Sequence, residues 1–200
     1  MGREKAFLSY DGQPFVSAIA GQLSMVSDDV VVAVGDKEPS DFGPLFGEGV
    51  RVCKDDRYLS NPLGGILTGL GLARHPQSAI VGCDTPLLRA EVIECLYEEM
   101  GDHVAAVPVW EEDEIMTMEP LCGVYSVIEA RKAATKALES DASLKRMVML
   151  LGDVQFVDVS RLRLVDPSLD SLVDINTPEE YARLEDRMRG QIPAQGQGGQ

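Results

Sequence analysis

Short apolar runs alternate with amphipathic stretches along most of the chain. The runs are rich in valine and other β-branched residues and carry apolar side chains on both faces, which is typical of strands buried inside a sheet. The pattern predicts strands at residues 30–35, 50–55, 79–84, 103–110, 121–126, 154–160 and 172–176.

The stretches between these runs carry apolar residues at helical spacing. They predict helices at about 14–25, 61–73 after a glycine-rich entry, 87–100, 127–138, 141 or 143 to 152, and 178–188. The last helix begins at Thr177-Pro178-Glu179-Glu180, a cap residue followed by proline and two acids. Residues 37–49 and the acidic stretch 111–116 are predicted loops.

Regular alternation of strand and helix predicts a three-layer α/β/α sandwich with a Rossmann-like, mainly parallel sheet. A chain of 200 residues with 44% hydrophobic residues suits one domain. We assign that domain to residues 1–188 and expect the low-complexity residues 189–200 to be a disordered tail.

The net charge of −15 argues against nucleic acid and anionic membranes as partners. The chain has no apolar run of the ~20 residues that a membrane helix needs, and no signal-peptide pattern at its start. Its four cysteines form no CxxC pair and lie in apolar segments, which predicts buried free thiols in a reducing cytoplasm.

Candidate chemistry lies where the predicted strands end, because ligands of parallel α/β sheets bind beyond the carboxyl ends of the strands. The run IVGCDTPLL (80–88) places Asp84 at such an end. A carboxylate there is a natural ligand for Mg²⁺. The alternative is that Asp84, before Thr-Pro, only caps the following helix; both interpretations remain open at this point.

Three further features have a functional and a structural interpretation. Lys5 could contact a phosphate or be a surface lysine. The closely spaced Gly64 and Gly65 could let the backbone approach a ligand or permit helix packing. Asp55 could accept hydrogen bonds from a base or sugar or sit in a solvated turn, and the same applies to Asp174 and Asn176.

Other chemistries fit poorly. His75 and His103 have no metal-ligand spacing. The chain has no GxSxG elbow, and Cys83 lies in an apolar run without an obvious base, which favours a core position. A phosphatase with Asp84 as nucleophile lacks the usual DxDxT context.

Taken in order, five segments resemble the molybdenum cofactor guanylyltransferases, within the wider group of MobA-like nucleotidyltransferases. The segments are Lys5, PLGGILTGL (62–70), CDTPLL (83–88), EPLCGVYS (119–126) and DINTPEEYARL (174–184). The resemblance implies transfer of GMP from GTP to molybdopterin with release of pyrophosphate, dependent on Mg²⁺.

Site residues follow from the resemblance position by position. Asp84 matches the metal-binding aspartate, Lys5 the lysine that contacts the triphosphate, and Asp55 an aspartate that helps bind the guanine nucleotide. The glycine-rich segment with Gly64 and Gly65 is expected on the nucleotide. Many members carry asparagine where this chain has Gly35, so a side-chain contact is not expected there. Transient contact with other molybdenum cofactor proteins is also expected.

Members of this group begin with a buried strand and a loop of the type LAGGxSxRMGxxKA, and this chain starts at the methionine of that pattern. We therefore expect unpaired strand edges inside the fold, and either a native start upstream of Met1 or impaired catalysis. The alternatives to a guanylyltransferase are a related enzyme that uses CTP or another phosphate acceptor, and a non-catalytic relative that binds the nucleotide or cofactor.

Overall fold

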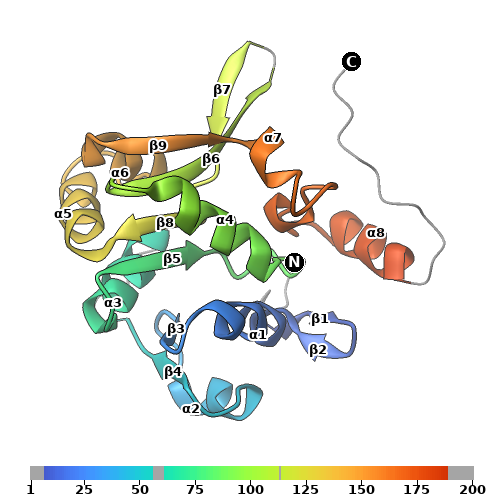
Figure 1. Ribbon diagram of the computed structural model, residues 1–200. Coiled ribbons are helices and arrows are strands. Elements are labelled where there is room, and N and C mark those ends of the chain that lie inside the picture. The colour runs from blue at the N-terminus through green and yellow to red at the C-terminus, as the bar shows by residue number, and fades with distance from the viewer. Residues whose placement is uncertain (1–6, 56–60, 113, 189–200) are drawn as a thin grey trace.

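The computed structural model describes residues 7–55, 61–112 and 114–188. Strands lie between two layers of helices (Figure 1). One layer contains α1 (Phe15–Val26) and α4 (Ala90–Met100), and the other contains α3 (Pro62–Leu72), α5 (Val127–Leu138) and α6 (Leu144–Leu151). The predicted three-layer α/β sandwich is therefore confirmed.

The larger sheet has five strands and is mixed rather than mainly parallel. Its order is β5 (Gln77–Val81), β8 (Cys122–Ser126) and β6 (Ala105–Glu112), with β9 (Val154–Asp158) beside β6. β8 runs antiparallel to both neighbours, whereas β9 is parallel to β6. The outer part of β6 forms a hairpin with β7 (Ile115–Met118), so residues 111–116, predicted as a loop, are largely strand.

Two smaller sheets precede the larger one in the chain. β1 (Ser9–Tyr10) and β2 (Gln13–Pro14) form a short antiparallel ribbon, and β3 (Val30–Ala33) pairs in parallel with β4 (Val50–Cys53). No strand of the described residues joins β3 to β5, and the β3–β4 pair lies below β5 in Figure 1. The expected unpaired edges are thus present in the described part of the fold.

Short helices fill two regions where the sequence predicted other structure. Residues 37–49, predicted as a loop, contain α2 (Pro39–Phe42) and a 3₁₀ turn, Gly43–Leu45. The predicted strand at 172–176 is wrong, because a second 3₁₀ turn, Asp170–Leu172, leads into a segment that joins none of the sheets formed by the described residues. α7 (Val159–Leu162) follows β9, and α8 (Pro178–Met188) ends the described chain.

The start of α8 is the capping arrangement that its sequence predicts. The Thr177 hydroxyl accepts a hydrogen bond from the Glu180 N–H at 3.1 Å, and the Glu180 carboxylate accepts from the N–H groups of Asn176 and Thr177. These bonds lower the pKa of Glu180. Within the described ranges, no helix has the length and apolarity needed to cross a membrane.

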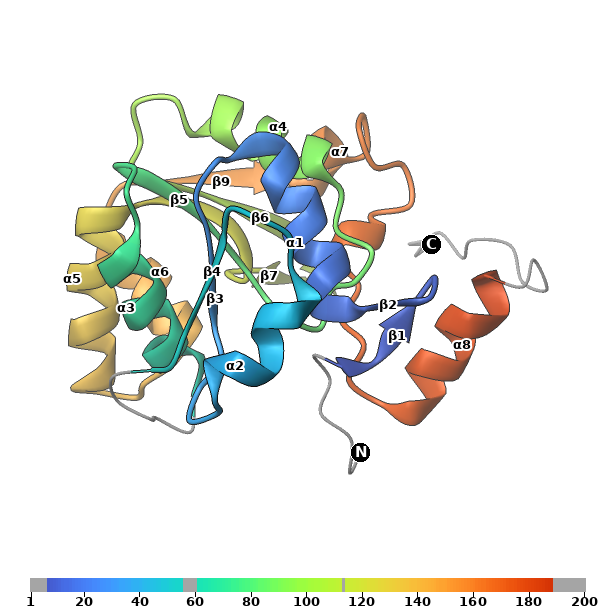
Figure 2. The ribbon, with the colours of Figure 1, turned by 90° about the horizontal axis from the view of Figure 1, so that it is seen from below.

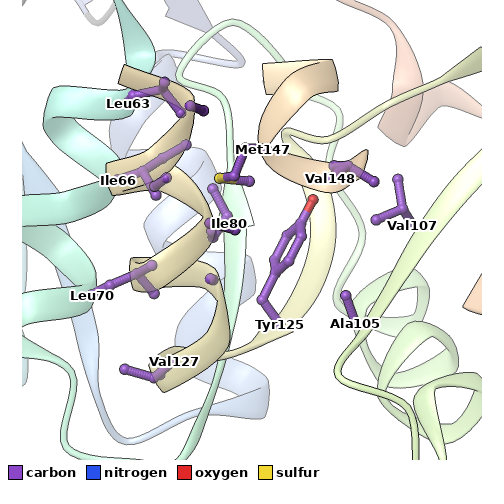
Figure 3. Close-up of a cluster of buried hydrophobic side chains, with 14 residues drawn as sticks. Leu63, Ile66, Leu70, Ile80, Ala105, Val107, Tyr125, Val127, Met147 and Val148 are labelled. Carbon is purple, nitrogen blue, oxygen red and sulfur yellow. The ribbon is translucent and has the colours of Figure 1, made fainter. Parts of the chain in front are cut away.

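Alternate residues of the central strands explain the two-sided core. Ala105 and Val107 of β6 pack with α3, α5 and α6, while Ala106 between them packs with α4. Figure 3 shows the first cluster, with Leu63, Ile66 and Leu70 of α3 near Ile80. Burying each of these large side chains contributes about 1.5–3 kcal/mol.

Tyr125 is the largest fully buried side chain and carries the only polar group drawn in that cluster (Figure 3). Its hydroxyl donates a 2.7 Å hydrogen bond to the Pro120 carbonyl. The ring passes over Gly123, where a Cβ atom would lie 2.7 Å from the phenol oxygen. The bond therefore fixes the turn before β8 to the core.

Replacing Tyr125 by phenylalanine tests this anchor. Tyr125→Phe should lower the free energy of unfolding by about 1–3 kcal/mol, because the Pro120 carbonyl loses its buried partner. Urea denaturation followed by circular dichroism measures the change.

Tyr181→Phe is the matched control, because the Tyr181 hydroxyl donates to Ser9 in an exposed position. We expect a loss within about 0.5 kcal/mol for this variant. Equal losses for the two variants would contradict the anchoring role of Tyr125.

Candidate functional site

A cavity of about 490 Å³ lies between β3 and β5 and is walled by α1, α3 and α4. Its size falls within the range of small-molecule sites. The carboxyl ends of the strands open into one end of it, where Asp55 and Asp84 both line the wall. We call this the acidic end of the cavity.

Asp84 lies in a turn three residues beyond the last residue of β5 and is half-buried. It does not cap the next helix. That helix, α4, begins only at Ala90, whose N–H bonds to the Gln22 side chain at 2.9 Å. The prediction that Asp84 caps the following helix is therefore wrong for α4, and Asp84 is one of the residues that line the cavity.

Two contacts hold the Asp84 turn in place. The Thr85 hydroxyl, which is buried, donates to the Gly82 carbonyl at 3.1 Å. The N–H of Ile175 donates to the Asp84 carbonyl at 2.8 Å. This second bond brings the segment from Asp174 to Asn176, predicted as a candidate from the sequence, beside the Asp84 turn.

Gly82 sets the direction of the Asp84 carboxylate. A Cβ atom at Gly82 would lie 2.6 Å from the Asp84 Oδ1 atom, so the carboxylate folds back over Gly82 and a larger residue there would displace it. The Gly82 N–H donates to the Leu121 carbonyl at 3.0 Å, which joins the turn to the segment before β8. Sequence reasoning missed this role, although Gly82 stands two residues before Asp84.

Glu119 is a second carboxyl group near Asp84 that the sequence analysis did not single out. Burial raises its pKa, and the charge of Asp84 raises it further, while the hydrogen bond from the Leu121 N–H at 2.9 Å lowers it. The one sequence feature that pointed to Glu119 is its position in the segment EPLCGVYS (119–126), just before a strand. Glu119 is thus easier to protonate than an ordinary glutamate.

Asp55 follows β4 at the other side of the acidic end. Its N–H donates to the Gly35 carbonyl at 2.8 Å, which ties together the ends of β3 and β4. Gly35 has a positive φ of 66° and, as a glycine, contributes only backbone to the cavity. The Asp55 Oδ2 atom lies 3.8 Å from where a Cβ of Gly65 would be.

Of the other predicted site residues, one lines the cavity, one does not, and one lies outside the described residues. Gly65 lines the cavity near the start of α3, whereas Gly64 is buried in the same helix and is not among the cavity-lining residues. Asn61 caps α3 by accepting a 2.9 Å hydrogen bond from the Leu63 N–H. Lys5 lies outside the described residues, so its contact with a triphosphate stays a prediction.

Two of the four cysteines are buried as expected, and two are not. Cys95 and Cys122 are buried, and burial raises the pKa of both thiols. Cys53 is half-buried, but Cys83 is exposed because β5 ends at Val81 and the chain turns before Cys83. The prediction of a core position for Cys83 is therefore wrong.

The donor set at the acidic end fits one mode of Mg²⁺ binding. Mg²⁺ usually takes one or two protein carboxylates and completes its coordination with water and substrate phosphates. Asp84 supplies an oriented carboxylate facing a cavity, and Glu119 lies near it. The described residues contain no cluster of three or more His, Cys, Asp or Glu side chains able to hold a metal on their own.

Comparison with known proteins identifies the family. The model of the MobA-like NTP transferase domain matches residues 1–157. A probable molybdenum cofactor guanylyltransferase of Methanosarcina acetivorans is 32% identical over 198 residues, covering 94% of this chain and 85% of the relative. The molybdenum cofactor guanylyltransferase of Desulfosudis oleivorans is 33% identical over 188 residues, covering 92% and 87%.

Solved structures agree in fold. The molybdopterin-guanine dinucleotide biosynthesis protein A of Archaeoglobus fulgidus superposes with a TM-score of 0.76 at 22% identity, covering 94% of this chain and 92% of that one. A 2-C-methyl-D-erythritol 4-phosphate cytidylyltransferase of Thermus thermophilus gives 0.71 at 16% identity, with coverages of 92% and 93%. With a strand-end carboxylate facing the cavity and a family model matching most of its length, this chain belongs to the MobA-like NTP transferases and is a nucleotidyltransferase.

Proposed function

We propose that this chain transfers GMP from GTP to molybdopterin and releases pyrophosphate, with Mg²⁺ held at Asp84. The observation that supports the proposal is that Asp84 and Asp55, each following a strand, line the same ligand-sized cavity. The names of the relatives from Methanosarcina acetivorans and Desulfosudis oleivorans support the guanylyl group and the molybdenum cofactor as substrates.

In this reaction the acceptor phosphate of molybdopterin attacks the α-phosphorus of GTP in line, and pyrophosphate leaves. Bound Mg²⁺ supplies positive charge beside the phosphate oxygens. The task of the protein is to hold the groups in place. Asp84 fixes the cation at a strand end, and the Gly82 backbone and Ile175 N–H keep the Asp84 turn from moving.

The nucleotide would lie across the acidic end, with Asp55 accepting hydrogen bonds from the base or sugar. Gly65 leaves that wall open, because a glycine there puts no side chain between α3 and Asp55. Lys5 is proposed to contact the triphosphate, and transient contacts with other molybdenum cofactor proteins stay a prediction.

Asp84→Asn tests the proposal. The amide keeps the size of the side chain but removes the charge that holds Mg²⁺, so we expect the rate of pyrophosphate release to fall about 100-fold or more. The assay mixes the chain with molybdopterin, Mg²⁺ and either GTP or CTP. Faster release with CTP than with GTP would overturn the guanylyl assignment.

Asp102→Asn is the matched control, because Asp102 is an exposed carboxylate in the turn after α4. It should leave the rate unchanged. If Asp84→Asn kept the rate of the Asp102→Asn protein, Asp84 would have no part in metal binding.

Gly65→Ala separates nucleotide binding from stability. A Cβ at Gly65 would meet Ala33 at 3.6 Å and Asp55 at 3.8 Å, ordinary contact distances, so the fold should accept it. Alanine in a helix interior should raise the unfolding free energy by about 0.5–1 kcal/mol. The same methyl group takes up space in the cavity near Asp55. We therefore expect weaker binding of Mg²⁺–GTP in calorimetric titration.

Gly71→Ala makes the same exchange in the same helix at an exposed position away from the cavity. It should stabilise the protein similarly without changing GTP affinity. Equal affinity for the two variants would remove Gly65 from the nucleotide site.

A further inference from the structure

The segment just before α8 supports the Asp84 turn from a distant part of the chain. Figure 2 shows α8 beside the β1–β2 ribbon, where the Tyr181 hydroxyl donates to the Ser9 carbonyl at 2.9 Å. The ribbon, the start of α1 and α8 share a small apolar cluster of buried residues, which are Leu8, Phe15, Ile175 and Leu184. Ile175 is only 2% exposed, so this cluster fixes its side chain.

Three successive backbone N–H groups of this segment have two different acceptors. The N–H of Ile175 donates to the Asp84 carbonyl at 2.8 Å. The next two, of Asn176 and Thr177, both donate to the Oε2 atom of Glu180, at 2.7 and 2.8 Å. The Asn176 N–H lies in the peptide plane that follows Ile175, so holding it restricts rotation of the backbone at Ile175.

The Glu180 carboxylate is well suited to hold this segment. Its hydrogen bonds from the N–H groups of Asn176 and Thr177 lower its pKa, so the group is charged at neutral pH. Hydrogen bonds to a charged acceptor are about twice as strong as those between neutral groups. One charged oxygen that accepts both N–H groups therefore keeps two successive peptide units in place.

The Asp84 turn is held at three points, and one of them is remote in sequence. The Thr85 hydroxyl bonds within the turn to Gly82, and the Gly82 N–H ties the turn to Leu121. The bond from Ile175 reaches the backbone of Asp84 itself. Because the Asp84 side chain extends from that backbone, a shift of the turn would redirect its carboxylate.

We propose that Glu180 is a positioning residue for Asp84. Its carboxylate holds the segment whose Ile175 N–H fixes the Asp84 turn, and it thereby sets the direction in which the Asp84 carboxylate meets Mg²⁺. In a capping box that serves only the helix, the same bonds would stabilise α8 without affecting a site outside it. The consequence for metal binding rests on the proposed function, whereas the link from Glu180 to the Asp84 turn does not.

The capping box has two halves that mutation can separate. Thr177→Ala removes the hydroxyl that accepts from the Glu180 N–H at 3.1 Å, but it keeps the two N–H groups that Glu180 holds. Glu180→Ala removes the acceptor of those two groups instead. Since each variant loses one half of the box, both should lower the melting temperature by about 2–4 °C.

Hydrogen exchange followed by NMR, without metal or nucleotide, tests the link itself. Glu180→Ala should speed exchange of the Ile175 amide by about 10-fold, because the bond to Asp84 opens more often. Thr177→Ala should change it by less than about 2-fold. Glu180→Gln keeps an oxygen that can accept both N–H groups, so it should restore exchange to within about 3-fold of the parent chain.

The Mg²⁺ dependence of pyrophosphate release tests the consequence for the site. Glu180→Ala should raise the Mg²⁺ concentration for half-maximal rate by about 10-fold, because a misdirected carboxylate holds the cation less well. The rate at saturating Mg²⁺ should fall by less than about 3-fold, since the bound cation supplies the same charge. Thr177→Ala and Asp102→Asn should keep the half-maximal concentration of the parent chain.

Three results would overturn the proposal. They are equal Ile175 exchange in the Glu180→Ala and Thr177→Ala proteins, no recovery in Glu180→Gln, and an unchanged Mg²⁺ requirement in Glu180→Ala although Asp84→Asn is inactive. A failure of the proposed function is recognised separately, by equal rates of Asp84→Asn and Asp102→Asn. The exchange measurement then still decides whether Glu180 holds the Asp84 turn, because it needs no enzymatic activity.

Discussion

Backbone hydrogen bonding between strands constrains this molecule more than any single side chain. β3 and β5 are tied at their amino ends through Asp29 and Arg74, and within the described ranges β3 pairs only with β4 and β5 only with β8. Because β3 and β5 run in the same direction, their carboxyl ends reach the same end of the cavity. Asp55 and Asp84 reach that end from chain segments 29 residues apart only because the strands bring them there.

Local patterns were sufficient for most elements and for one site residue. The all-apolar run of β3 and the valine-rich runs of β4 and β9 predicted these strands, because β-branched residues favour extended backbone. Thr177-Pro178 predicted the start of α8 because capping depends only on neighbouring residues. Asp84 was predicted at a strand end by the same logic, since the position of a carboxylate relative to an apolar run can be read from a few residues.

What the sequence did not reveal depends on distant pairing. The antiparallel insertion of β8 between β5 and β6 brings Glu119 and Leu121 beside Asp84, and no local period encodes that register. Gly82 and Gly123 matter because side chains two residues away fold over them, which requires knowing the turn geometry. Cys83 was placed in the core because its apolar neighbours hid the end of β5 at Val81.

The two carboxyl groups near the Asp84 turn are coupled through their charges. Burial raises the pKa of Glu119 and the negative charge of Asp84 raises it further, whereas the hydrogen bond from the Leu121 N–H lowers it. A cation held at Asp84 would offset the repulsion between the two carboxylates and so favour the ionised form of Glu119. By the same coupling, an ionised Glu119 would favour the bound cation, so the second carboxyl group should strengthen the metal binding proposed for the first.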